Sequence, residues 1–384
     1  MEQDGMARRI LICVGEMSGD QHAANLVREL RALDGEVIVD ALGGPALRQA
    51  GAVIRHDTVS RAAMGLAALG RWREVLLLEK WVREYVAATR PDLVICVDSW
   101  EMNKRFARIA HAGGVKVMYY IAPQVWASRE GRVGKMRQWV DRVACIHRFE
   151  EDYLTRRGIA ATYVGHPLFD HVRPVPRRPA EQRYPNRPAI IALVAGSRQS
   201  VAGANFPRLL EVARRMKSQM NDLKFQIPTT AATDGVVREI LASRAMADDS
   251  DFLVALDGFD GVLPECDLCL TVSGTATLHA AAFGVPMIAV YYGNPVLWHV
   301  IGRWIVKTRR YVVVNILAGD GEMIVPEFIP WYGSVEPVAQ AALDLLNDPV
   351  RREGMSRRLT NLVATIGQPG ASKRAAGVAM ELMT

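Results

Sequence analysis

The chain has 384 residues, and this length favours two domains of ordinary size over a single core. Half of the residues are hydrophobic and 23% are charged, a composition that excludes disordered, collagen-like and fibrous proteins. The formal net charge of +6 favours an anionic partner: a nucleotide, a phosphorylated substrate, an acidic membrane surface or a nucleic acid.

The five cysteines lie mostly in apolar runs and lack the density of a secreted disulfide framework, so we expect a reducing cytoplasm. Only a short apolar stretch precedes Glu16, so neither a secretory signal nor a transit peptide is expected. Residues 268–302 contain no Asp, Glu, Lys or Arg, but a proline, several glycines and His279 interrupt them. We therefore expect strand, loop and buried helix there rather than a membrane span.

In the first half of the chain, short β-branched runs alternate with longer helical patterns, which is typical of a parallel sheet covered on both faces. The expected strands are 10–14, 37–41, 93–97, 116–121, 142–146 and 161–164. The expected helices are 21–33, 72–89, 103–112 and 150–157. Residues 1–166 are thus expected to form a doubly wound, Rossmann-like domain.

Residues 167–188 hold six of the nineteen prolines and five arginines, and this composition predicts an interdomain linker. The alternation then restarts, with strands expected at 189–194, 224–228, 252–255, 268–272 and 286–291, and helices at 206–219, 234–243 and 275–283. Residues 189–349 form a second Rossmann-like domain in this interpretation. Helices are also expected at 335–346, 350–366 and 372–382, and residues 350–384 could pack back on the first domain.

The α/β class predicted here binds ligands at the carboxyl ends of its strands, so two such domains should face a cleft that holds the chemistry. The first strand runs into a turn with Glu16, Ser18 and Asp20, which is not a GxGxxG dinucleotide fingerprint. A tight turn with an N-cap residue is the plain alternative. Asp98 follows the third expected strand, where apolar surroundings can raise a carboxyl pKa into the range of a general base; an ordinary loop aspartate is the alternative.

An aromatic segment, 120–126, is followed by the basic residues Arg129, Arg132, Lys135 and Arg137. These cations could meet phosphate or lipid head groups, or form a solvated helix face. In the second domain, Ser197 and Arg198 offer donors to an anion. The segment 273–277 closes a strand and opens a helix, an arrangement that favours diphosphate binding over simple capping.

Other features are weaker. Cys266 and Cys269 form a single CxxC in a strand-like setting, which argues against zinc or redox chemistry. Asp249 and Asp251 are interpreted as a solvated turn, and His166 as either a site residue or a hinge residue. No catalytic triad pattern and no Walker loop stands out.

Several segments together resemble the lipid-A-disaccharide synthase family, glycosyltransferase family 19, with the two-domain GT-B fold. They agree in order from residue 10 to about 349. The quoted segments are GEMSGDQHAANL at 15–26, AMGLAALGRWREVL at 63–76, PDLVICVDSWEMN at 91–103, YYIAPQVWASREGRVGKM at 119–136, VGHPLFD at 164–170, GSR at 196–198, SGTATLHAA at 273–281, NILAG at 315–319 and VPE at 325–327. The chain departs from the family pattern at Val201 and His279, where the family has acidic residues.

The resemblance implies an inverting transfer of 2,3-diacylglucosamine from its UDP conjugate to the 6-hydroxyl of 2,3-diacylglucosamine 1-phosphate. UDP-sugar is a substrate, and neither a cofactor nor a metal ion is expected. Asp98 is the expected base, with Glu16 the next choice. The expected nucleotide contacts are Ser197, Arg198, Ser273, Gly274, Thr275, Thr277, His279 and Asn315. The expected acceptor and lipid contacts are Ser18, Asp20, Met64, Glu101, Asn103, Gln124, Trp126, Arg129 and His166.

Because both substrates carry acyl chains, the resemblance also implies peripheral contact with the inner face of the anionic cytoplasmic membrane of a Gram-negative-type bacterium. Residues 64–78 could lie on lipid, or form a helix that packs on its own sheet. A homodimer is left open, and nucleic acid is the weakest partner because the basic residues are dispersed. The alternatives are a GT-B enzyme with another acceptor, a UDP-sugar epimerase, and an inactive nucleotide-binding paralogue.

Overall fold

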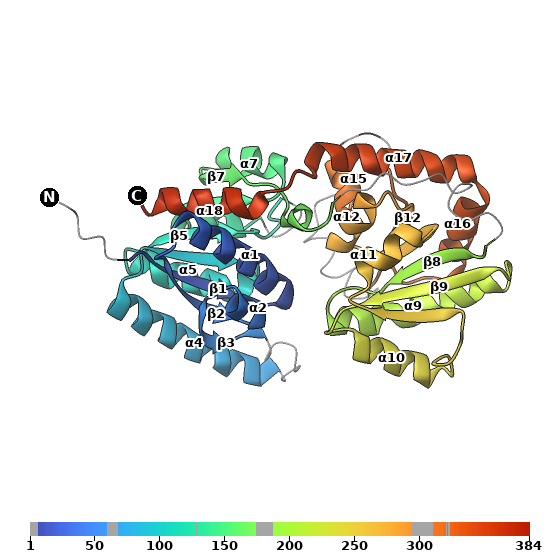
Figure 1. Ribbon diagram of the computed structural model, residues 1–384, viewed down its shortest axis with the longest axis horizontal. Coiled ribbons are helices and arrows are strands. Elements are labelled where there is room, and N and C mark those ends of the chain that lie inside the picture. The colour runs from blue at the N-terminus through green and yellow to red at the C-terminus, as the bar shows by residue number, and fades with distance from the viewer. Residues whose placement is uncertain are drawn as a thin grey trace. The chain divides into compact units, whose positions relative to one another are not determined.

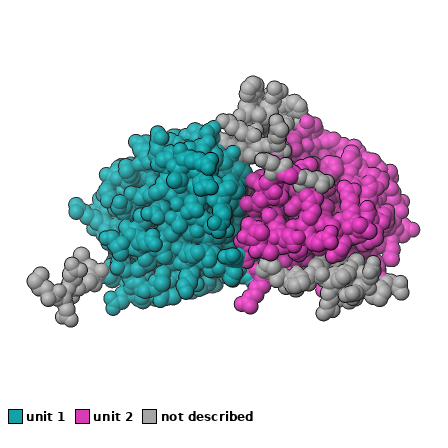
Figure 2. All heavy atoms as spheres, turned by 90° about the horizontal axis from the view of Figure 1, so that it is seen from above, with its two compact units in different colours: residues 1–171, 368–384 teal, residues 172–367 magenta. Residues whose placement is uncertain are grey.

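A computed structural model describes residues 7–59, 68–126, 130–173, 187–293, 310–319, 321 and 323–384. The chain divides into two compact units, coloured separately in Figure 2. Unit 1 comprises Met1–His171 and Gln368–Thr384, and unit 2 comprises Val172–Gly367. Most of the expected linker, residues 174–186, lies outside the described residues, and its beginning forms a short 3-10 helix, η1 (Pro167–Asp170).

Unit 1 is built on a parallel sheet with the strand order β3-β2-β1-β4-β5-β6-β7 among its described residues (Figure 1). Its strands are β1 (Arg9–Val14), β2 (Ile38–Gly43), β3 (Val53–Asp57), β4 (Leu93–Val97), β5 (Lys116–Tyr120), β6 (Arg142–Cys145) and β7 (Ala161–Tyr163). β4 is buried throughout because helices cover both faces, and this is why it consists of one unbroken apolar run. β3 was not expected, since it is an edge strand whose residues are exposed or half-buried.

Two apolar cores lie on the two faces of this sheet. Alternate residues of β1 enter them: Ile10 and Ile12 belong to one core, and Leu11 and Cys13 to the other. The helices of unit 1 are α1 (Met17–Leu33), α2 (Pro45–Gln49), α4 (Ala68–Thr89), α5 (Trp100–Ala112), α6 (Arg132–Trp139), α7 (Arg148–Thr155) and α18 (Ala371–Leu382).

The last helix of the chain, α18, belongs to unit 1, where it packs beside α1 (Figure 1). Asp170 holds its first turn: its Oδ1 accepts from the amides of Gly370 and Ala371 at 2.8 Å, and its Oδ2 accepts from the Ser372 amide at 2.9 Å. Arg374 Nε donates to the Val164 carbonyl at 2.7 Å. A carboxylate at a helix start satisfies amides that the helix itself leaves unpaired.

Unit 2 repeats the architecture, with the strand order β10-β9-β8-β11-β12-β13 among its described residues. Its strands are β8 (Ala189–Val194), β9 (Leu223–Thr229), β10 (Phe252–Leu256), β11 (Leu268–Val272), β12 (Met287–Tyr292) and β13 (Glu327–Trp331). Its helices are α9 (Gln199–Lys217), α10 (Asp234–Ser243), α11 (Phe259–Val262), η2 (Leu263–Glu265), α12 (Thr275–Ala282), α15 (Val313–Leu317), α16 (Glu336–Asn347) and α17 (Pro349–Ile366). The α/β class with two doubly wound parallel sheets is confirmed.

The apolar segment after residue 267 is divided between β11, α12 and β12 as far as Gly293, as expected, and the rest of it lies outside the described residues. Among the residues that the structure describes, no helix is long and apolar enough to cross a membrane.

Replacement of Asp170 tests how α18 is held. We expect Asp170→Ala to lower the free energy of unfolding by about 1–2 kcal/mol, because three amides at the start of α18 lose their acceptor. Urea denaturation measures this, with Glu381→Ala on the exposed side of the same helix as the control. Equal stability of the two variants would contradict the assigned capping role.

Candidate active site

The carboxyl ends of β1, β4 and β5 form one edge of the unit 1 sheet. Val14 pairs with Val97, and Val97 pairs with Tyr120, so the residues that follow these three strands lie next to one another. Glu16 follows β1 as the N-cap residue of α1, with extended backbone at φ −143°. Asp98 follows β4. The two carboxylates expected to act in catalysis therefore belong to the same edge of one sheet.

The backbone at Asp98 is strained. Asp98 and Ser99 have φ values of +50° and +42°, and Ile121, which follows β5, has +57°. Non-glycine residues seldom adopt this left-handed conformation, and a β-branched residue does so at greater cost. Such strain persists only where surrounding contacts impose it, and it is concentrated at functional sites.

Contacts from three directions hold the Asp98 backbone. Its amide donates to the Tyr120 carbonyl at 3.1 Å. Its carbonyl accepts from Tyr119 Oη at 2.5 Å and from Asn103 Nδ2 at 2.9 Å. Asn103 is fully buried, and its Nδ2 also donates to the Val97 carbonyl at 2.9 Å. Asn103 was expected to contact the acceptor, but the structure gives it the role of fixing the turn that carries Asp98.

Gly15 permits a close approach at the same edge, because a Cβ atom there would lie 2.9 Å from Ser99 Oγ. Ser18 is exposed in the first turn of α1. Asp20, in contrast, is 1% exposed and accepts from the amides of Gly44 at 2.7 Å and Ala46 at 2.9 Å. Burial raises the pKa of Asp20. The structure thus uses Asp20 to hold the start of α2, whereas the sequence suggested a substrate contact.

A buried histidine and glutamate cluster lies beyond β6 and β7. Trp126 Nε1 donates to Glu150 Oε1 at 2.8 Å, and Glu150 Oε2 accepts from the His147 amide at 3.0 Å. Burial raises the pKa of Glu150 to about 7 and lowers that of His147 to about 4. The ring of His166 lies 5.8 Å from that of His147, and burial together with this neighbour lowers the pKa of His166. Both histidines are therefore neutral at pH 7.

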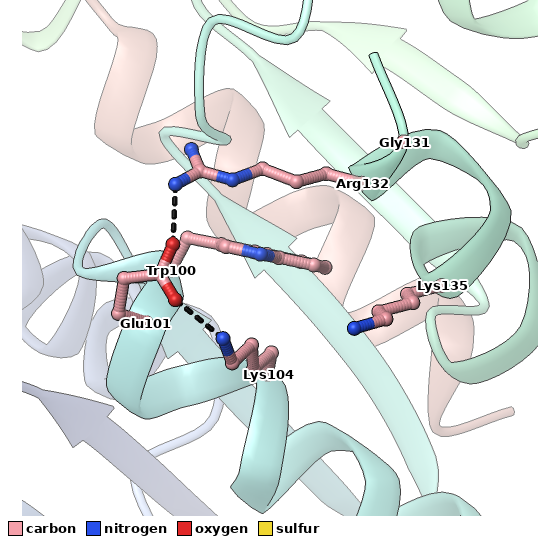
Figure 3. Close-up of a pocket in the computed structure, with 6 residues that line it drawn as sticks. All are labelled: Trp100, Glu101, Lys104, Gly131, Arg132 and Lys135. Carbon is pink, nitrogen blue, oxygen red and sulfur yellow. Dashed lines mark hydrogen bonds and ion pairs between the residues drawn. The ribbon is translucent and has the colours of Figure 1, made fainter. Parts of the chain in front are cut away.

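Trp126 and His166 were expected site residues, whereas His147 and Glu150, which link them in the structure, were not. The only sequence signal for this pair was its place directly after a short strand. Gln124 is exposed in the same loop. Met64 and Arg129 lie outside the described residues. Glu101, in the first turn of α5, forms ion pairs with Lys104 and Arg132 (Figure 3).

In unit 2, the segment after β11 leads directly into α12. Ser273 Oγ donates to the Tyr311 carbonyl at 2.7 Å, and Thr277 Oγ1 donates to the Gly274 carbonyl at 2.8 Å, so both hydroxyls have partners within the protein. Gly274 has φ +148° and ψ −164°, a conformation that requires glycine. The amides of Thr275 and Ala276 belong to the first helical turn, which has no intrahelical acceptors. This helix start therefore offers an anion its backbone amides and the exposed side chain of Thr275.

The segment after β8 lies beside the one after β11, because these two strands pair in register, Thr271 with Val194. Ser197 and Arg198 are exposed there, and Arg198 is the N-cap residue of α9. That helix begins seven residues earlier than expected, at Gln199 instead of 206, and contains Pro207. The expected start at residue 206 was therefore wrong, because the helix follows the GSR segment at once.

Two expected nucleotide contacts have partners inside the protein. Asn315 is fully buried: its Nδ2 donates to the Val325 carbonyl at 2.8 Å and to Glu327 Oε1 at 2.7 Å, and its Oδ1 accepts from the amides of Ile324 and Val325. Its side chain has no hydrogen-bonding capacity left for a nucleotide. His279 Nε2 lies 2.6 Å from Asp260 Oδ1, which leaves Nδ1 as its remaining polar atom.

The weaker sequence features have structural roles. Cys266 and Cys269 are both buried, and Cys266 Sγ donates to the Val262 carbonyl at 3.2 Å. Asp249 Oδ1 accepts from the Asp251 amide at 2.9 Å, which is a turn, as expected. Within the described ranges, no group of three or more His, Cys, Asp or Glu side chains is placed to hold a metal ion.

Comparisons with solved structures confirm the fold. Staphylococcus aureus MnaA, solved with UDP, has a TM-score of 0.67 at 16% identity, and the match covers 98% of this chain and 97% of that one. Acinetobacter baumannii MurG has a TM-score of 0.59 at 14% identity, with 98% and 100% covered. These neighbours have the GT-B architecture that the sequence predicted.

Comparisons of sequence are more specific. A curated relative from Geobacter sulfurreducens, named lipid-A-disaccharide synthase, is 35% identical over 99% of this chain and 98% of its own length. Another of that name, from Nitrosococcus oceani, is 34% identical over 99% of this chain and 97% of its own length. The model of the lipid-A-disaccharide synthetase family matches residues 10–381. The chain therefore belongs to this family, and it is a hexosyltransferase of lipid A synthesis.

Proposed function

We propose that this protein transfers 2,3-diacylglucosamine from UDP-2,3-diacylglucosamine to the 6-hydroxyl of 2,3-diacylglucosamine 1-phosphate. The products are the β-1,6-linked disaccharide phosphate and UDP. The observation that carries the proposal is the family match over residues 10–381, which includes both sheet edges described above. Incubation of the protein with both substrates, followed by detection of disaccharide and UDP, tests it directly.

In this mechanism Asp98 is the general base. Its carboxylate takes the proton from the 6-hydroxyl as that oxygen forms a bond to the anomeric carbon of the donor, while the bond from this carbon to the UDP oxygen breaks. The proposal is supported by the strained turn, which Asn103 and Tyr119 hold in one conformation. Glu16 is the second candidate, because it follows the neighbouring strand at the same edge.

The leaving diphosphate gains negative charge as the bond breaks. We assign its stabilisation to the first amides of α12, at Thr275 and Ala276, and to Arg198 and Ser197 beside them. The partial positive charge of a helix start, together with a guanidinium, supplies this without a metal ion or cofactor. Asn315 contributes indirectly, through the segment that it holds against Glu327.

The acyl chains of both substrates lead to a proposal about location: peripheral association with the inner face of the cytoplasmic membrane. The described part of α4 supports it. Leu76 and Leu77 are 45% and 68% exposed, and Arg73 is exposed beside them. Leu78 and Val82 are buried on the other side of the helix. One face of α4 therefore packs on the sheet, as the alternative interpretation had it, while another presents apolar side chains to solvent.

Asp98→Asn tests the base. Asparagine tolerates the left-handed backbone as well as aspartate does, so the turn should survive while the basic oxygen is lost. We expect kcat to fall by about 10²–10⁴-fold, with UDP affinity unchanged by calorimetry. Asp344→Asn, on an exposed part of α16, is the matched control. Retention of full disaccharide formation in Asp98→Asn would remove Asp98 from this role.

The double variant Leu76→Ser/Leu77→Ser tests the membrane contact. Burial of one leucine side chain contributes about 1.5–3 kcal/mol, so loss of these two partly covered side chains should weaken vesicle binding at least about tenfold. Flotation with vesicles of anionic phospholipid measures this, and binding should also fall with salt. Leu253→Ser in unit 2, at a position 53% exposed, is the control. Unchanged flotation of the double variant would exclude this face of α4 as the contact.

A further inference from the structure

A small basic hollow in unit 1 has no part in the mechanism above. Its volume is about 250 Å³, and its lining residues come from the first turns of α5 and α6 (Figure 3). They are Trp100, Glu101, Lys104, Gly131, Arg132 and Lys135. Pockets for whole drug-sized ligands measure about 300–1,000 Å³, so this hollow suits a head group rather than an entire glycolipid.

The hollow has an excess of positive charge. Glu101 forms ion pairs with both Lys104 and Arg132, and in Figure 3 the Lys135 ammonium group points into the same space. The hydrogen bond from Lys104 is the main cause of a lowered pKa at Glu101, so this carboxyl group is ionised at neutral pH. Three cations and one carboxylate leave a net charge of about +2. Among the described residues of the hollow, Glu101 pairs with Lys104 and Arg132 but not with Lys135.

Glu101 also fixes the geometry of the hollow. The side chains of Lys104 and Arg132 are 25% and 19% exposed, and the shared carboxylate holds both in one arrangement. Long basic side chains lose rotamer freedom when they bind a ligand, and this loss is smaller where they are already ordered. The cations are thus already ordered, and because Glu101 neutralises only one of their charges, the hollow can bind a further anion.

Trp100 supplies an apolar surface beside these cations. It is 5% exposed and lies 5.5 Å from the Tyr119 ring, measured between ring centroids. In Figure 3 its indole extends across the hollow between Arg132 and Lys104. An aromatic face next to cations suits a ligand that is both a sugar and an anion, since the C–H face of a sugar packs on an aromatic ring.

We infer that this hollow binds the 1-phosphate of the acceptor, with Lys104, Arg132 and Lys135 around the phosphate and Trp100 against the sugar. The inference rests on the proposed function. A phosphomonoester carries a charge of about −1.5 to −2 at pH 7, which matches the excess of about +2, whereas a phospholipid phosphodiester carries only about −1. Its oxygens also accept the charge-assisted hydrogen bonds that guanidinium and ammonium groups donate.

The position of the hollow in the chain agrees with this ligand. Trp100 lies two residues after Asp98, so their Cα atoms are at most about 7 Å apart. In the acceptor, C1, which carries the phosphate, and C5, which carries the C6 hydroxymethyl group, are both bonded to the ring oxygen. The phosphate and the 6-hydroxyl are therefore attached near the same end of the sugar ring, and a phosphate held beside Trp100 places the 6-hydroxyl within reach of the neighbouring Asp98.

The charge of Lys135 is the part of the site to test, because its removal leaves the Glu101 ion pairs intact. With Lys135→Gln, we expect the KM for the phosphorylated acceptor to rise about tenfold, with kcat and the KM for the UDP-sugar little changed. An acceptor without the 1-phosphate should react poorly with the wild type, and Lys135→Gln should not slow its reaction further. Lys135→Arg should restore the wild-type KM. Arg137→Gln, an equal loss of charge on the exposed side of α6, is the control.

The inference would be overturned if Lys135→Gln and Arg137→Gln raised the KM for the acceptor equally, or if Lys135→Gln raised the KM equally for acceptors with and without the 1-phosphate. Either result would point to a general effect of charge on lipid binding. Direct binding gives a result that does not depend on turnover. We expect glucosamine 1-phosphate to bind the full-length protein by ligand-observed NMR, more strongly than inorganic phosphate, and Lys135→Gln to abolish this. No binding, or equal binding of inorganic phosphate, would refute the site. An absence of disaccharide with the wild type would refute the proposed function separately.

Discussion

The structure of the candidate site depends on one buried amide. Asn103 donates from the interior of unit 1 to the carbonyls of Val97 and Asp98, at the point where β4 ends and the chain turns into α5. Two consecutive left-handed residues, Asp98 and Ser99, would be costly in an isolated peptide. The hydrogen bonds from Asn103 and Tyr119 offset that cost, and they place a carboxylate at the sheet edge with its backbone fixed.

In unit 2, buried asparagine side chains likewise hold irregular backbone near the ends of strands. Asn315 uses all of its hydrogen-bonding capacity to join α15 to the segment that leads into β13. Asn205 accepts from the Tyr292 amide at 2.7 Å and so ties α9 to the end of β12. In both units a buried asparagine, which carries no charge, stabilises irregular backbone at the carboxyl edge of the sheet, where no ladder partner is available.

The sequence predicts the buried strands better than it predicts the roles of the polar residues that follow them. The strands β1, β4 and β11, which are buried except at Arg9, were identified because burial on both faces requires unbroken apolar runs. Among the edge strands, β7 and β10 were expected, whereas β3 and β13 were missed. The last three residues of β3 are polar, and Pro330 interrupts the apolar run of β13. The sequence located the two sheet edges but did not show which polar residues there bind ligands and which hold the backbone. Asp20, Asn103 and Asn315 have side chains that could contact a ligand. Their hydrogen bonds to Gly44, Cys13 and Val325, which the sequence cannot show, give them structural roles.

His279 stands where the family resemblance led us to expect an acidic residue, and its surroundings make it a hydrogen-bond acceptor. Burial between Phe259 and Phe283 lowers its pKa, so the imidazole is neutral at pH 7. The Asp260 carboxylate only accepts hydrogen bonds, so its contact with Nε2 fixes the ring proton on that atom. Nδ1 then has a lone pair, and His279 is an acceptor, as a carboxylate would be. One lone pair in place of a carboxylate's several limits such a residue to a single hydroxyl, so in the proposed mechanism the grip on UDP depends mainly on the diphosphate end, at the start of α12.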